Sequence, residues 1–257
     1  MLFISESTHG RCKAFADDFR NNFDAADHLL PQLSYARELG QDMAYSVSVL
    51  EIDLHVRRRD FSMAMEILGK VGERIGRYEV DVFQHIDLMI LKARIWDKAG
   101  YPQKGFSLAM RAASLAHRAY LLPALWDAVG AICRILTSMR DFDPAARLME
   151  SIMPQILECE DCDLAARSFS CLADAHMGLA GEAGAESKQR KERLTKALEC
   201  IDRAFDDWSR LTDVSGQCEM MAKKATIMHL MGEPVLANDC AAKYLDIKKA
   251  AREQNQT

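Results

Sequence analysis

The chain has 257 residues, a formal net charge of −5 and 28% charged residues. This balance argues against a nucleic-acid-binding face spread over the whole chain. No run approaches the ~18–20 apolar residues that span a bilayer, so we expect neither nucleic acid nor a membrane as a partner.

The predicted secondary structure is helical throughout. Alanine and methionine are abundant, and the alternation of β-branched residues that strands need is nearly absent. Apolar residues instead recur in steps of three and four. The predicted helices cover, in chain order, residues 5–20, 24–40, 42–58, 62–75, 80–99, 103–119, 123–139, 144–158, 164–179, 194–211, 218–231 and 234–252.

A small residue recurs near the start of the second helix of each predicted pair. The clearest examples are Ala26, Ala64, Gly105, Ala145 and Ala237, in steps of 38, 41, 40 and 92. The last step becomes two steps of about 40 with about a dozen inserted residues if Ala197 is the missing member. A period of about 40 residues predicts an all-α solenoid of about six helix-turn-helix, tetratricopeptide-like repeats. We expect one such domain over residues 1–257.

Two segments depart from the repeat pattern. Residues 180–193 are small, polar and charged, so we interpret them as a surface insert or flexible loop within the solenoid. The basic run 188–193 inside this insert is either simply solvated or a contact for an acidic partner. The polar residues 253–257 are predicted to fray.

The sequence offers no recognisable catalytic or metal-binding motif. The seven histidines form no H-E-x-x-H pair, and no glycine-rich phosphate loop or G-x-S-x-G is present. Cys159 and Cys162 form a C-x-x-C, but they lie at the end of a predicted helix without a second pair at zinc-site spacing. We therefore expect a non-enzymatic protein that uses no cofactor, metal ion or small-molecule substrate.

The eight cysteines indicate a reducing compartment. The first residues, MLFISESTHGRCK, lack the basic region and apolar core of a signal peptide. Most of the cysteines fall on apolar-periodic positions, as Cys133 does in AVGAICRIL. We interpret them as reduced, buried side chains of a cytosolic or nuclear protein.

One polar position recurs on the first helices. With the small residue counted as position twenty of a repeat, position nine falls on Asp53, Arg94, Arg134 and Thr226. Repeat arrays bind partners along the concave wall that their first helices form. One interpretation is a polar groove for an extended or helical partner segment. The other is that these residues are ordinary solvent-facing positions of amphipathic helices.

The second half of the chain carries more specific motifs. They are the helix end I-M-P-Q-I-L, the alanine-rich helix that follows it, the insert, the helix A-L-x-x-I-D-x-A and the closing M-G-E-P-x-x-A-N-x-C. In these features residues 123–248 resemble the C-terminal repeats of subunit 5 of the anaphase-promoting complex (the cyclosome). Proteins of that family are longer, so we expect this chain to correspond to their C-terminal repeat portion.

The resemblance implies a specific role. It implies a non-catalytic scaffold subunit of a multisubunit cullin-RING-type ubiquitin ligase that controls mitotic progression. The implied partners are the large scaffold and platform subunits of that complex, and the implied location is the nucleus and cytoplasm. The alternative is a generic tetratricopeptide adaptor that binds a partner peptide or helix in its concave groove.

Overall fold

A computed structural model of the chain describes residues 41–75, 82–184 and 187–254. In these ranges every regular element is an α-helix, which confirms the predicted all-α class. The helices are α3 (Gln41–Arg57), α4 (Phe61–Ile75), α5 (Val82–Lys98), α6 (Pro102–Arg118), α7 (Leu122–Ser138), α8 (Phe142–Glu158), α9 (Cys162–Glu182), α10 (Lys188–Arg210), α11 (Val214–Leu230) and α12 (Pro234–Gln254). The helices predicted over 5–20 and 24–40, with Ala26, lie outside the described residues.

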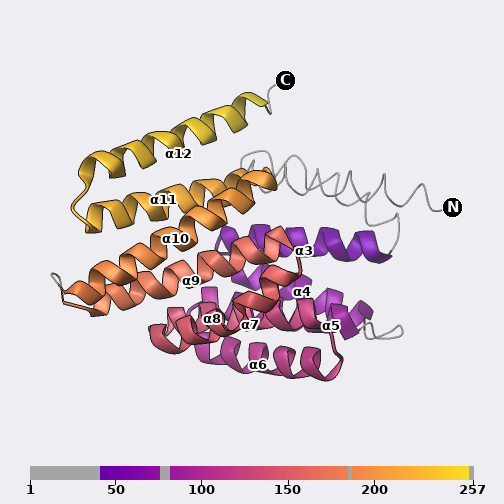
Figure 1. Cartoon of the computed structure of the whole chain (residues 1–257). Coiled ribbons are helices and arrows are strands. Elements are labelled where there is room, and N and C mark those ends of the chain that lie inside the picture. Colours follow the sequence, from indigo (N-terminus) through magenta and orange to yellow (C-terminus); the bar gives the residue numbers. More distant parts are fainter. Residues whose placement is uncertain (1–40, 76–81, 185–186, 255–257) are drawn as a thin grey trace.

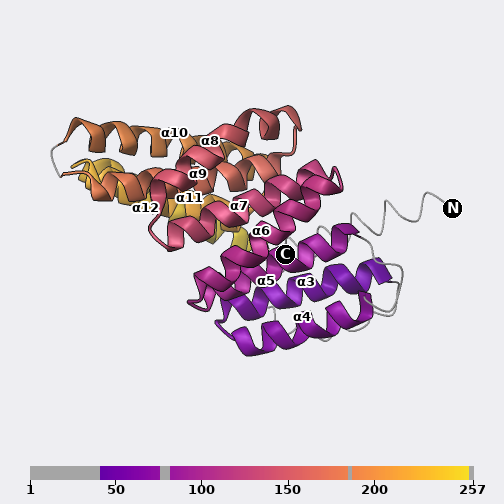
Figure 2. The ribbon, with the colours of Figure 1, turned by 90° about the horizontal axis from the view of Figure 1, so that it is seen from below.

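The helices pair into antiparallel hairpins that stack side by side into a solenoid (Figures 1 and 2). Each second helix, such as α6 or α8, packs on its own first helix and on the first helix of the next hairpin. The first helix α7 also packs directly on α5 and on α9. Five hairpins lie within the described ranges, because the first of the six predicted repeats falls before residue 41.

The turns between helices are short and share one backbone geometry. The second residue after the helix end has positive φ at Arg59, Gly100, Arg140 and Gly232, as well as at Tyr120, Glu160 and Thr212. After α7, the Asp141 N–H donates to the Leu136 carbonyl at 2.9 Å, and the Arg140 N–H donates to the Thr137 carbonyl at 3.0 Å. These bonds satisfy carbonyls that a helix end leaves free. Because each of these turns has the same geometry, the repeats have a nearly constant length.

The small residues near the start of the second helices allow neighbouring helices to approach closely. Ala64, Ala145 and Ala197 are almost completely buried, whereas Ala237 on the last helix is half-buried. Gly105 of α6 is the tightest case, since a Cβ atom added to it would lie 2.6 Å from the Ala93 carbonyl oxygen of α5. In the interior of the array, these small residues therefore let the two helices of a hairpin pack closely.

Replacement of Gly105 by alanine is expected to lower the free energy of unfolding by about 1–3 kcal/mol, because the colliding atom is backbone and the helices must separate. Gly69 in α4 is the matched control: it is exposed, and an added Cβ meets nothing within 4 Å. Gly69→Ala should raise the free energy of unfolding by about 0.5–1 kcal/mol. Urea unfolding of both variants tests the difference, and equal effects would contradict it.

The predicted loop over residues 180–193 is mostly helical, so that expectation was wrong. Helix α9 continues to Glu182 and α10 begins at Lys188. The Ser187 hydroxyl caps α10 by accepting from the Arg190 N–H at 3.0 Å. Lysine, arginine, glutamine and glutamate are good helix formers even without an apolar face. The inserted residues therefore lengthen both helices of one hairpin.

The predicted frayed tail is also partly helical. Helix α12 reaches Gln254, so residues 253–254 belong to it, and the remaining residues of the tail lie outside the described part. In the part of the chain that the structure describes, no helix combines the length and apolar character needed to cross a bilayer.

Candidate functional site

Three of the four predicted binding residues lie together on the inner wall formed by the first helices. Asp53, Arg94 and Arg134 are the thirteenth residues of α3, α5 and α7. All three line one pocket of about 260 Å³. The fourth, Thr226, occupies the same position of α11 but is exposed, and its hydroxyl donates to the Ala222 carbonyl of its own helix. Thr226 is not part of this pocket.

The sequence analysis missed one residue of this series. Asp174 is the thirteenth residue of α9 and also lines the pocket. When position nine of this repeat is counted back from Ala197, it falls inside the insert and not on Asp174, because the inserted residues lie between Asp174 and Ala197. Counting forward by 40 residues from Arg134 finds it. The Asp174 carboxylate accepts a hydrogen bond from Lys223 of α11 at 2.8 Å, which links this wall to the last hairpin.

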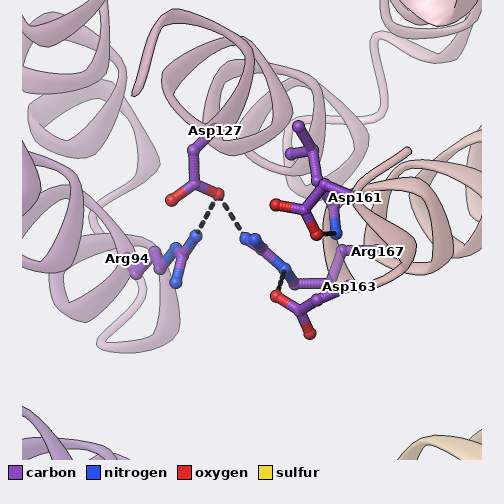
Figure 3. A network of polar contacts seen from close by, with 6 residues as sticks. Arg94, Asp127, Asp161, Asp163 and Arg167 are labelled. Carbon is purple, nitrogen blue, oxygen red and sulfur yellow. Dashed lines mark hydrogen bonds and ion pairs between the residues drawn. The ribbon is translucent and has the colours of Figure 1, made fainter. Parts of the chain in front are cut away.

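A network of ion pairs joins the first helices next to the pocket (Figure 3). The Asp127 carboxylate of α7 accepts from the Arg94 guanidinium of α5 at 2.9 Å and from the Arg167 guanidinium of α9. Arg167 also donates to Asp163 at 2.9 Å. Burial raises the pKa of Asp127, but Arg94 and Arg167 together outweigh burial and lower it to about 2. Asp127 is therefore ionised at neutral pH and connects three consecutive hairpins.

Asp127→Asn is expected to lower the free energy of unfolding by about 2–4 kcal/mol, because it leaves the partly buried Arg94 guanidinium without its counter-charge and leaves Arg167 with Asp163 alone. Asp202 provides the matched control, since it pairs with Lys224 at 2.5 Å and its side chain is 54% exposed. Asp202→Asn should change the free energy of unfolding by no more than about 0.5 kcal/mol. Urea unfolding at low ionic strength measures both, and a small effect at Asp127 would show that the network is dispensable.

Three residues that line the pocket have buried polar atoms without a hydrogen-bond partner among the described residues. These atoms are Nε of Arg94, Nη2 of Arg134 and Oδ1 of Asp97. The other oxygen of Asp97 accepts from the Ser138 hydroxyl at 3.2 Å. Burial lowers the pKa of Arg134 to about 10, with the nearby Arg94 guanidinium contributing, so Arg134 is still charged at neutral pH. Buried polar groups are nearly always satisfied in folded proteins, so water or a ligand is expected to complete this set of atoms, and the pocket is a candidate site.

A second hollow of about 460 Å³ lies between α8, α9 and α10. His176 of α9 is buried in its floor, with Nε2 3.5 Å from a Glu150 oxygen and Nδ1 3.5 Å from an Arg193 nitrogen. Burial lowers the pKa of His176 to about 4, and Glu150 only partly offsets it. The imidazole is therefore neutral in the folded chain at neutral pH. The neutral imidazole packs within the hollow, and protonation of His176 at low pH would destabilise the folded chain.

The free energy of unfolding should fall as the pH drops from 7 towards 4, with a contribution of about 2–3 kcal/mol from His176. The sign follows because the unfolded chain takes up a proton near pH 6.5, whereas the folded chain resists protonation down to about pH 4. His176→Gln should remove this contribution. His117→Gln, at an exposed position of α6, should keep the wild-type slope. Denaturation at several pH values tests this, and parallel slopes for all three proteins would refute it.

In the described ranges, no three histidine, cysteine, aspartate or glutamate side chains gather as metal ligands. Cys159 and Cys162 are free thiols at the junction of α8 and α9, the first exposed and the second half-buried. The pocket on the inner wall is therefore the candidate site.

Comparison with known proteins places the fold among tetratricopeptide-like repeat structures. No protein-family model and no curated protein matches the chain. The crystal structure of BtubC (BKLC) from P. vanneervenii is similar, with a TM-score of 0.52 and 14% identity over 90% of this chain and 91% of that one. A second similar structure is a single-residue variant of a putative kinesin light chain of Podosopora anserina with nearly identical TPR-like repeats. Its TM-score is 0.51, with 14% identity over 90% of this chain and 99% of that one. At this identity the likeness establishes the fold.

Proposed function

We propose that this chain is a non-catalytic adaptor of the tetratricopeptide type that holds a segment of a protein partner along its inner wall. The observation that carries the proposal is the pocket between α3, α5, α7 and α9, where Arg94, Asp97 and Arg134 each have a buried polar atom that no described residue satisfies. A folded chain that leaves such atoms free forgoes about 1–3 kcal/mol for each. A bound segment that supplies the missing hydrogen bonds recovers that energy.

The proposal predicts that filling the pocket abolishes partner binding. Ser138 lines the pocket near its mouth and is exposed, so Ser138→Trp should block the wall without disturbing the core. Ser151 is the matched control, because it is also an exposed helical serine whose hydroxyl donates to a carbonyl of its own helix, on α8 away from the pocket. Stoichiometric companions purified with the tagged chain from its native cell should fall at least tenfold with Ser138→Trp and persist with Ser151→Trp. Equal recovery would refute the adaptor function.

A more specific function is also proposed: a scaffold subunit of the anaphase-promoting complex, located in the nucleus and cytoplasm. Its support is the sequence resemblance over residues 123–248, together with exposed apolar side chains on α12. Val235 is 70% exposed and Leu245 is 63% exposed, and exposed apolar surface at the end of a repeat array suits contact with a neighbouring subunit. The identities of the purified companions decide this: a cullin, a RING subunit and large scaffold subunits support it. A single small partner favours the generic adaptor.

A further inference from the structure

The charged groups that line the inner-wall pocket are only partly paired among the described residues. Three of them take part in ion pairs: Asp53 with Arg57, Asp174 with Lys223, and Arg94 with Asp127. Of the remaining charged groups, Arg134 and Lys98 have no ion-pair partner among the described residues, and Asp97 is the one carboxylate left to face them. Two cations therefore face one carboxylate in this part of the lining, and an anionic ligand would pair with the second cation.

The unsatisfied atoms define what that ligand must offer. Nε of Arg94 and Nη2 of Arg134 are donors that need an acceptor, whereas Oδ1 of Asp97 is an acceptor that needs a donor. The Arg94 and Arg134 guanidiniums lie close enough for each to disfavour the other's charge. An anion between them removes that repulsion and accepts from both.

We propose that the pocket receives the side-chain carboxylate of an acidic residue in the partner segment, with that residue's main-chain N–H donating to Asp97. This inference rests on the proposed adaptor function and specifies the chemistry of the partner. A free amino acid offers the same carboxylate, but its ammonium group adds a further cation to a lining in which Arg134 and Lys98 already lack ion-pair partners among the described residues. An acidic residue within a polypeptide supplies an anion and a neutral N–H together, which matches both the charge and the free atoms.

The test uses the full chain labelled with ¹⁵N at arginine and three probes: a short capped peptide of serine and alanine with a central glutamate, the same peptide with glutamine, and free glutamate. Side-chain NMR signals of Arg94 and Arg134, assigned by substitution, report binding at the pocket. The glutamate peptide should shift both signals and bind at least about tenfold more tightly than the glutamine peptide, because hydrogen bonds from guanidinium to an ionised carboxylate are stronger than those to a neutral amide.

Arg134→Gln should weaken the binding of the glutamate peptide by the same factor. Its side chain has no ion-pair partner among the described residues, so this substitution is expected to leave the fold intact, and circular dichroism checks that it does. Arg111→Gln, at an exposed position of α6, changes the net charge equally and should leave binding unchanged. Arg134→Lys keeps the charge in the pocket and should retain part of the affinity.

Three outcomes would overturn the inference: equal affinity for the glutamate and glutamine peptides, binding of free glutamate alone, or no binding of any probe, which would leave ordered water as the occupant. Failure here is distinct from failure of the adaptor function. If Ser138→Trp removes the cellular companions while the peptides show no acidic preference, the adaptor stands and only the acidic partner is wrong. If Ser138→Trp has no effect on the companions, the adaptor function itself fails.

Discussion

The Asp127 carboxylate is the constraint on which the inner wall depends. It accepts from guanidiniums of the hairpins before and after its own, so the first helices α5, α7 and α9 are held together by charge as well as by apolar packing. This pairing uses a nitrogen of Arg94, whereas Nη2 of Arg134, one repeat further along, has no hydrogen-bond partner among the described residues. The ion-pair network around Asp127 and the polar groups that line the pocket thus follow from the same arrangement of charged residues on the first helices.

Packing and binding rely on different faces of the same helices. Each hairpin is too small to bury its apolar face alone, and stability comes from contacts with its neighbours. Small residues such as Ala64, Gly105 and Ala145 make those contacts close. These interfaces offset the cost of the unsatisfied polar atoms that the inner wall carries.

The sequence predicted the architecture well because the repeat is encoded locally. Apolar periodicity and turn residues placed the described helices from α3 to α9 within a few residues, and the position-nine count brought Asp53, Arg94 and Arg134 to one pocket. Asp174 was missed because the count passed through the insert. The network centred on Asp127 was not predictable, since a pattern within one helix does not show which charge of the next repeat it meets. The insert was misjudged because its helices depend on capping by Ser187 and on propensity rather than on an apolar face.

The lengthened hairpin of α9 and α10 shows how such an array absorbs extra sequence. The added residues extend both arms beyond the neighbouring hairpins, while Arg134 and Asp174 keep the 40-residue separation of the unmodified repeats. Growth therefore takes place at the free tip, perpendicular to the direction in which the repeats stack, and does not disturb the register of the wall. The length and charge of this tip can therefore vary independently of the surface that faces the pocket.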